Sequence, residues 1–231
     1  MIIIDRKSKR ILTHQFLTET PPGSGEILGI RRFPMGVIKT VLDLGAHVGM
    51  FSVLARLLHP GARVVSIEAS PANIGVLTEN TKNMLIEVHN VAVGSDSTVL
   101  LNTRGSMSGT VQEADTGNIK SYSLPGLLTH LKVDPNEGLF IKVDIEGSER
   151  NFVDDQEAEN ILRQCVGIDF EGHTTSQIPD AYNYVKWLKG FLSDTHDIFE
   201  NGNWGRPGRV RGTAIIVIKK GVPQIIHPLS K

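Results

Sequence analysis

From Thr40 onward, short apolar runs alternate with amphipathic stretches, and this alternation limits the possible folds more than any other feature of the sequence. Five apolar runs have the length of strands: 41–44, 63–68, 86–93, 139–144 and 166–170. Strands that alternate with helices predict a parallel sheet covered on both faces. No helical pattern separates two further strands, 196–200 and 213–219, so the last strand is expected to run antiparallel.

The intervening stretches complete an α/β pattern of a doubly wound, Rossmann-like, seven-stranded sheet. Five of them have helical spacing: 48–58, 71–81, 124–131, 157–163 and 180–192. The region 94–123 interrupts the rhythm, and its segments STVLLNT and GTVQEA predict a small β-hairpin insertion after the third strand. A barrel would need eight strand–helix units, which this chain lacks.

The domain assignment follows from the same pattern. Residues 1–39 are irregular and contain the breaker TPPGSGE, so we expect an N-terminal arm with one or two short strands, belonging to the same domain as residues 40–231. The start MIIIDRKSKR is too short and too charged for a signal peptide or a membrane span. The single cysteine, Cys165, excludes an internal disulfide and favours a reducing, cytoplasmic location.

The stretch VLDLGAHVGMFS, residues 41–52, is the first candidate for a ligand site. Ligands of open α/β sheets bind beyond the carboxyl ends of the strands, and Asp43, Gly45 and Gly49 lie at such an end. A P-loop is excluded because no Gly-Lys-Ser/Thr ending follows. A dinucleotide site would place a pyrophosphate here, where the carboxylate of Asp43 would repel it. That carboxylate suits an ammonium group, as in S-adenosylmethionine.

A second acid supports this hypothesis. Glu68 closes the second strand, nineteen residues after Gly49, where an acid can accept hydrogen bonds from both hydroxyls of a ribose. Two carboxylates at adjacent strand ends favour a methyl donor over a nicotinamide cofactor.

The three stretches DLGAHVG, SIEASPANIGVLTENTK and IKVDIEGSE resemble the FkbM-type family of S-adenosylmethionine-dependent methyltransferases, over about residues 40–220. The resemblance implies a Rossmann-like methyltransferase fold that acts mainly on hydroxyl groups of sugars and small natural products. It implies that the methionine end of the cofactor is lined by Asp43, Gly45, Ala46, His47 and Gly49. It places Glu68 at the ribose and, near the adenine, Ala69, Ser70 and Asn90. His47 and Ala69 depart from the residues common in the family.

Polar groups that follow the fourth and fifth strands are the candidate catalytic residues. Asp144 and Glu146 come from KVDIEGSE, and Glu171 and His173 from FEGHTT. Methylation of a hydroxyl requires loss of its proton, which a carboxylate or an imidazole can accept. His173 is a candidate base, with an ordinary pKa of about 6.5. Alternatively, Asp144 and Glu171 would bind Mg²⁺ that lowers the pKa of the hydroxyl.

The segment NGNWGRPGRVRG is expected to form a loop at the same edge of the sheet. Its arginines, Arg206, Arg209 and Arg211, are donors for phosphate or carboxylate groups, and Trp204 could stack on a sugar or a base. A solvated hairpin without a role remains the alternative. The functional interpretation predicts an anionic acceptor: a sugar phosphate, a nucleotide or an RNA end, although the net charge of −1 does not indicate RNA.

The sequence therefore predicts an S-adenosylmethionine-dependent O-methyltransferase that acts on a sugar, a nucleotide or a small natural product. An RNA methyltransferase, a nicotinamide-dependent oxidoreductase and a cofactor-binding module without turnover are the alternatives. No Asn-Pro-Pro-Tyr or Asp-Pro-Pro-Tyr tetrapeptide follows the fourth strand, which argues against amino-group methylation of nucleobases. The oligomeric state is not indicated.

Overall fold

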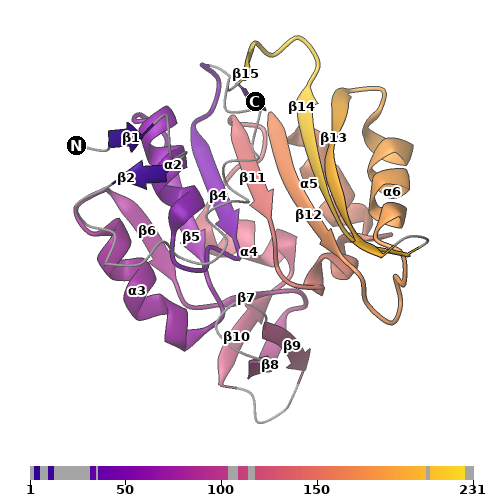
Figure 1. Ribbon diagram of the computed structural model, residues 1–231, viewed down its shortest axis with the longest axis horizontal. Helices are drawn as coiled ribbons and strands as arrows, with labels where there is room; N and C mark the ends of the chain where they lie inside the picture. The colour runs from indigo at the N-terminus through magenta and orange to yellow at the C-terminus, as the bar shows by residue number, and fades with distance from the viewer. Residues whose placement is uncertain are drawn as a thin grey trace.

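The computed structural model describes residues 3–5, 10–12, 32–34, 36–103, 109–113, 118–206 and 209–226. A seven-stranded sheet forms its centre (Figure 1). Its strands are β4 (Thr40–Leu44), β5 (Arg63–Ile67), β6 (Ile86–His89), β11 (Leu139–Val143), β12 (Gly167–His173), β13 (His196–Arg206) and β14 (Arg209–Lys219).

The order of the strands across this sheet is β13-β14-β12-β11-β4-β5-β6. The pairs from β12 to β6 are parallel, whereas β14 runs antiparallel to both of its neighbours. This arrangement confirms the predicted α/β fold with an antiparallel last strand. The chain leaves β4 toward β6 and later returns to place β11 on the other side of β4. Ligands of open α/β sheets bind where the strand order reverses in this way.

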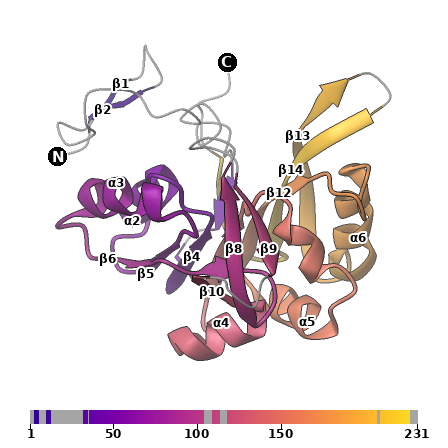
Figure 2. The same cartoon turned by 90° about the horizontal axis from the view of Figure 1, so that it is seen from below.

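Helices cover both faces of the sheet (Figure 2). Their bounds are α2 (Met50–Leu58), α3 (Pro71–Thr81), α4 (Leu124–Leu131), α5 (Gln156–Gln164) and α6 (Tyr182–Leu192). Val41 packs with α2 on one face, and Leu42 packs with α4, α5 and α6 on the other, because successive side chains of a strand point to opposite sides. No helix among the described residues is both long enough and apolar enough to cross a bilayer.

A second, four-stranded sheet occupies the region of the predicted insertion. It consists of β7 (Ala92–Val93), β8 (Ser97–Thr103), β9 (Gly109–Glu113) and β10 (Ile119–Tyr122), in the order β7-β10-β8-β9. The antiparallel pair β8–β9 confirms the predicted hairpin. The predicted strand 86–93 is divided between two sheets, because Ala92 and Val93 pair with β10 rather than continue beside β5. This second sheet lies beyond the carboxyl ends of the central strands (Figure 1).

The prediction of a loop across NGNWGRPGRVRG is wrong. β13 and β14 extend through it as a hairpin, in which Trp204 pairs with Gly212 and Arg206 with Arg209. Two irregularities in the register accommodate the glycine-rich sequence, which was interpreted as a loop because glycine, asparagine and proline favour turns. Gly212 also pairs with His173 at the end of β12, so the hairpin continues past the carboxyl edge of the sheet. Residues 207–208 lie outside the described residues.

Parts of the N-terminal arm are described as short strands. β1 (Ile3–Asp5) pairs with β2 (Arg10–Leu12), and β3 (Arg32–Pro34) pairs with β15 (Gln224–Ile226). The arm and the end of the chain thus share a two-stranded sheet. That residues 1–39 belong to the same domain stays a prediction.

The turn after β4 provides a test of the backbone geometry. Gly45 has a φ of +80°, and a Cβ atom there would overlap the carbonyl oxygen of Asp144. We expect Gly45→Ala to lower the free energy of unfolding by ~2–4 kcal/mol, because it combines left-handed strain with a backbone clash. Gly61→Ala is the control, since no atom lies within 4 Å of the added methyl group. Equal unfolding free energies of the two variants, measured with urea, would contradict this account.

Candidate functional site

The segment 43–49, called the glycine turn below, connects β4 to α2. Gly45 and Ala46 both donate their backbone N–H groups to the carbonyl of Ile67 at the end of β5, at 2.9 Å. Three residues of the turn have left-handed φ angles: Gly45 at 80°, His47 at 51° and Gly49 at 88°. The turn is therefore held against the carboxyl end of β5, and its left-handed glycines confirm the predicted tight turn.

Glu68 follows β5 and binds the glycine turn directly. Its Oε2 accepts the backbone N–H of His47 at 2.8 Å, and its Oε1 accepts that of Ser70 at 2.8 Å. Oε1 also accepts a hydrogen bond from the amide of Asn73, at 3.2 Å. These donors stabilise a carboxylate whose residue is only 8% exposed.

Asn90, at the end of the third central strand, completes this group. Its side-chain amide donates to the carbonyl oxygens of Glu68 at 2.9 Å and Ala69 at 3.0 Å. The structure thus brings together the residues that the resemblance places at the ribose and the adenine. That they bind a cofactor stays a prediction.

Asp43 lies deeper than the sequence suggested. Its side chain is fully buried, and its Oδ2 accepts a hydrogen bond of 2.6 Å from Ser52 of α2. The other oxygen, Oδ1, has no hydrogen-bond partner and lies 3.5 Å from the ammonium group of Lys142. Burial raises the pKa of this carboxyl group, and Lys142 and Ser52 oppose that effect. The negative charge of Asp43 is thus compensated inside the protein by the positive charge of Lys142.

Lys142 connects the glycine turn to the end of β11. Its Nζ donates to the carbonyl oxygen of Gly45 at 3.0 Å and lies 3.1 Å from Oδ2 of Asp144. Burial alone would lower the pKa of Lys142, but the carboxylates of Asp144 and Asp43 outweigh it and raise the pKa above its usual range. Lys142 is therefore a permanent cation between the two strand ends.

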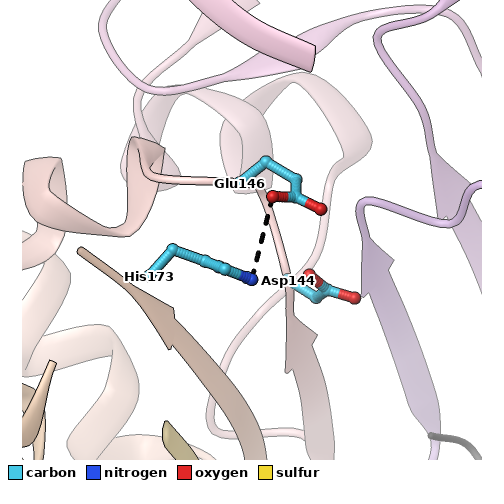
Figure 3. Close-up of side chains that lie close together, drawn as sticks. All are labelled: Asp144, Glu146 and His173. Atoms are coloured by element: carbon cyan, nitrogen blue, oxygen red, sulfur yellow. Dashed lines mark ion pairs between the residues drawn. The ribbon is translucent and has the colours of Figure 1, made fainter. Parts of the chain in front are cut away.

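The second part of the site is the acid–histidine cluster, which comprises Asp144, Glu146, Glu171 and His173. Nε2 of His173 lies 3.4 Å from Glu171. It also lies 3.8 Å from Glu146, and Figure 3 shows this ion pair beside Asp144. Glu171 and His173 lie within β12 rather than after it, because this strand is longer than predicted. The structure confirms that the four predicted residues lie together, whereas their catalytic role stays a prediction.

Glu149 is a buried residue that forms a hydrogen bond with the histidine of this cluster. It belongs to the 3₁₀ helix η1 (Ser148–Phe152) and is fully buried. Its Oε1 accepts hydrogen bonds from Nδ1 of His173 at 3.0 Å and from the backbone N–H of Ile145 at 2.9 Å. Its Oε2 accepts the backbone N–H of Gly147 at 2.7 Å.

The protonation of the cluster differs from that of isolated side chains. Burial would lower the pKa of His173, but hydrogen bonds with Glu149 and Glu171 outweigh burial and raise the pKa to about 11. Burial raises the pKa of Glu146 to about 7, although His173 opposes this shift. At neutral pH His173 is therefore an imidazolium cation, and Glu146 is the member of this pair that exchanges a proton.

The donor atoms do not fit the predicted magnesium ion. Among the described residues, the three-residue set with ligand atoms within 4.8 Å of one another is Asp144, Glu146 and His173, without Glu171. Mg²⁺ prefers oxygen ligands, whereas this set includes an imidazole nitrogen. Lys142 also approaches Asp144 to 3.1 Å and competes with a cation there. The cluster therefore does not match the ligand set of a magnesium site.

Sequence reasoning assigned no role to Lys142 or Glu149, although both belong to the stretch IKVDIEGSE. One signal was available for Lys142. A lysine in an otherwise apolar central strand is rarely buried without a charged partner. Glu149 gave no comparable signal, because its partner His173 lies on a different strand.

The comparisons with known proteins agree with this geometry. The model of the methyltransferase FkbM domain matches residues 43–191, which is more than half of the chain. The chain belongs to the FkbM methyltransferase family. The matched segment contains the glycine turn, Glu68 and the acid–histidine cluster. No curated protein matched the chain.

A solved FkbM methyltransferase structure shares the fold of this chain at low sequence identity. The FkbM methyltransferase from Methylobacillus flagellatus is 17% identical, with a TM-score of 0.51, over 80% of this chain and 44% of that one. This chain thus spans less than half the length of that protein. An O-methyltransferase from Bacillus cereus, in complex with SAH, is 16% identical with a TM-score of 0.46, over 90% of this chain and 84% of the other. A precorrin-6y C5,15-methyltransferase from Geobacter metallireducens is 13% identical with a TM-score of 0.45, over 95% and 98%. At TM-scores below 0.5, these last two matches add nothing to the assignment.

Asp169, beside the cluster, makes the stability of the protein depend on pH. It lies opposite Lys142 in the pairing of β11 and β12. Burial raises its pKa from 3.8 to about 7, and Lys142 offsets only part of this shift. The folded protein therefore holds a proton on Asp169 more tightly than the unfolded chain does. This contribution to stability is fully present below the unfolded-state pKa and is lost as the pH rises through about 7.

Asp169→Asn removes this ionisable group. We expect the unfolding free energy of the Asp169→Asn variant, minus that of the native protein, to be higher at pH 8 than at pH 5 by ~2 kcal/mol. Urea unfolding at the two pH values measures the difference. Asp197→Asn, at an exposed position of β13, is the matched control. A gain in stability that is the same at both pH values would exclude the ionisation of Asp169 as its cause.

Proposed function

We propose that this protein is an S-adenosylmethionine-dependent methyltransferase that methylates a hydroxyl group. The supporting observation is the direct contact between the glycine turn and the acid–histidine cluster. Lys142 bonds the carbonyl of Gly45 and pairs with Asp144, so a ligand held at the turn would lie next to the cluster. Family membership supports the transfer of a methyl group.

Two features of the residues support this cofactor. Glu68 presents a carboxylate for ribose hydroxyls, since its Oε2 accepts one hydrogen bond within the protein, from His47, and can accept a further one. The left-handed glycines allow the backbone to approach a ligand closely. The proposed cofactor site comprises Asp43, Gly45, Ala46, His47, Gly49, Glu68, Ala69, Ser70 and Asn90. When bound, S-adenosylmethionine supplies an electrophilic methyl group on a positively charged sulfur.

Glu146 is the proposed proton acceptor. A hydroxyl group that becomes methylated loses its proton, and Glu146 gains one near neutral pH because its pKa is about 7. The imidazolium of His173, 3.8 Å away, stabilises the ionised form of Glu146 before the proton arrives. Asp144 and Glu171 add negative charge that favours a cationic cofactor.

The proposed acceptor is a sugar, a nucleotide or a small natural product with an anionic group. Its support is the hairpin of β13 and β14, which carries Trp204, Arg206, Arg209 and Arg211 past the carboxyl edge of the sheet. An RNA end would satisfy the same arginines. A reducing, cytoplasmic location is part of the proposal, because the only cysteine, Cys165, is buried as a free thiol.

Two measurements test the proposal as a whole. Calorimetry should show binding of S-adenosylhomocysteine and not of NADH. A screen of sugars, nucleotides and capped RNA with a radiolabelled methyl donor should then yield a product labelled on oxygen. Binding of NADH alone would contradict the proposal, and so would label on nitrogen or carbon.

The assignment of Glu68 to the ribose gives a quantitative expectation. Glu68→Ala should weaken S-adenosylhomocysteine binding by ~1–3 kcal/mol, because it leaves hydrogen bonds of the ribose hydroxyls unmade. Calorimetry at one pH measures the loss. Glu87→Ala is the control, since Glu87 lies on the neighbouring strand and pairs with Arg63 at 2.8 Å. Wild-type affinity in Glu68→Ala would exclude the ribose contact.

The role of Glu146 predicts a pH dependence. Because only the ionised carboxylate accepts a proton, kcat/KM should rise with pH through about 7 and then level off. Glu146→Gln should lower kcat by ~10²–10⁴-fold, the range of general base catalysis, with S-adenosylhomocysteine binding preserved. Glu157→Gln, in the first turn of α5, is the control. Wild-type turnover of Glu146→Gln would contradict this role, as would complete loss of native activity on chelation.

A further inference from the structure

Glu149 is a buried carboxylate at this edge of the sheet. It is 0% exposed and accepts three hydrogen bonds, one from the ring of His173 and two from backbone N–H groups. A buried carboxylate is stable only when such donors satisfy its charge. Every one of these donors belongs either to His173 or to the segment that carries Asp144 and Glu146.

The backbone of that segment is shaped around Glu149. Glu146 has a φ of 53° and Gly147 a φ of 102°, so two successive residues are left-handed. This conformation directs the N–H groups of Ile145 and Gly147 toward the two oxygens of one carboxylate. Left-handed residues other than glycine cost energy and persist only where surrounding contacts fix them. Glu149 provides these contacts, and it therefore determines where Glu146 lies.

The same carboxylate determines the orientation of the His173 ring. Because an ionised carboxylate only accepts hydrogen bonds, Nδ1 of His173 must carry a proton. Nε2 is then the nitrogen that faces Glu146 and Glu171, at 3.8 and 3.4 Å. The hydroxyl of Tyr184 donates to the backbone carbonyl of His173 at 3.2 Å and fixes the residue from the other side.

We propose that Glu149 is a positioning residue that holds His173 and the Glu146 turn in one fixed arrangement, and that it acts on methyl transfer only through these two residues. It touches no reacting atom, because it is fully buried behind the histidine ring. The proposal rests on the proposed function, but its structural part concerns the protein without any ligand.

The structural part is tested by nuclear magnetic resonance of ¹⁵N-histidine-labelled protein, with the His173 signals identified by their loss in His173→Asn. We expect a proton on Nδ1, with a downfield signal typical of a bond to a carboxylate. In Glu149→Gln this signal should move toward that of a solvent-bonded imidazole. An unprotonated Nδ1 in the native protein would overturn the proposal, even if Glu149→Gln fails to fold.

Glu159→Gln is the matched control. Glu159 is also a carboxylate that accepts a ring N–H, from Trp187 at 2.7 Å, but it lies on α5 outside the cluster. Its substitution should leave the His173 signals unchanged. If Glu149→Gln changes them no more than Glu159→Gln does, Glu149 does not hold the ring.

The functional part is tested with a double-mutant cycle. Glu149→Gln should lower kcat by ~10–100-fold, less than the ~10²–10⁴-fold that a general base itself contributes, with little change in KM or in S-adenosylhomocysteine affinity. In a His173→Asn background, Glu149→Gln should cost clearly less than in the native background, because part of its effect passes through His173. Equal losses in both backgrounds would overturn the positioning role.

These outcomes are separate from those that test the enzymatic activity. If the protein binds no S-adenosylhomocysteine, the proposed function fails, whereas the resonance experiment still decides whether Glu149 holds His173. If binding and turnover are normal in Glu149→Gln, the proposed function stands and the positioning role fails.

Discussion

The ammonium group of Lys142 is the interaction on which the arrangement of this site depends. It lies between Asp43 of β4 and Asp144 after β11, and it bonds the carbonyl of Gly45. Without this cation, two carboxylates would be left close together in a region of low dielectric constant, at a cost of several kcal/mol. Because Lys142 contacts both strand ends, it sets the position of the glycine turn relative to the acid–histidine cluster.

Backbone sterics reinforce this electrostatic link. Asp144 donates its N–H group to the carbonyl of Leu44, so the ladder between β4 and β11 continues past the strand ends. The carbonyl of Asp144 then approaches Gly45 so closely that no side chain fits there. The glycine turn and the acid–histidine cluster thus become neighbours through one lysine and one glycine.

The charges of the cluster explain why its members do not behave as isolated side chains. His173 is surrounded by Glu149, Glu171 and Glu146, and it is held as a cation well above neutral pH. Glu146 lies among the same charges, but its contact with His173 is longer, at 3.8 Å. Burial therefore dominates and brings the pKa of Glu146 to about 7. The different pKa shifts of His173 and Glu146 follow from their surroundings rather than from residue type.

The sequence by itself determined the seven-stranded α/β fold, because alternating strands and helices predict a parallel sheet covered on both faces, and the chain has too few such units for a barrel. It also identified the glycine turn, Glu68 and the four cluster residues, since strand ends are readable from local patterns. It failed at the β13–β14 hairpin, where the pairing of these two strands with each other overrides the turn preference of glycine and asparagine.

Only the tertiary structure decided which groups are paired and charged. The partnership of Glu149 with His173 joins two different elements, and local sequence contains no trace of such a contact. The same holds for the pKa of Glu146, which depends on burial and on charges from three segments. Local patterns specify secondary structure, whereas charge states depend on distances that exist only after the strands have packed side by side.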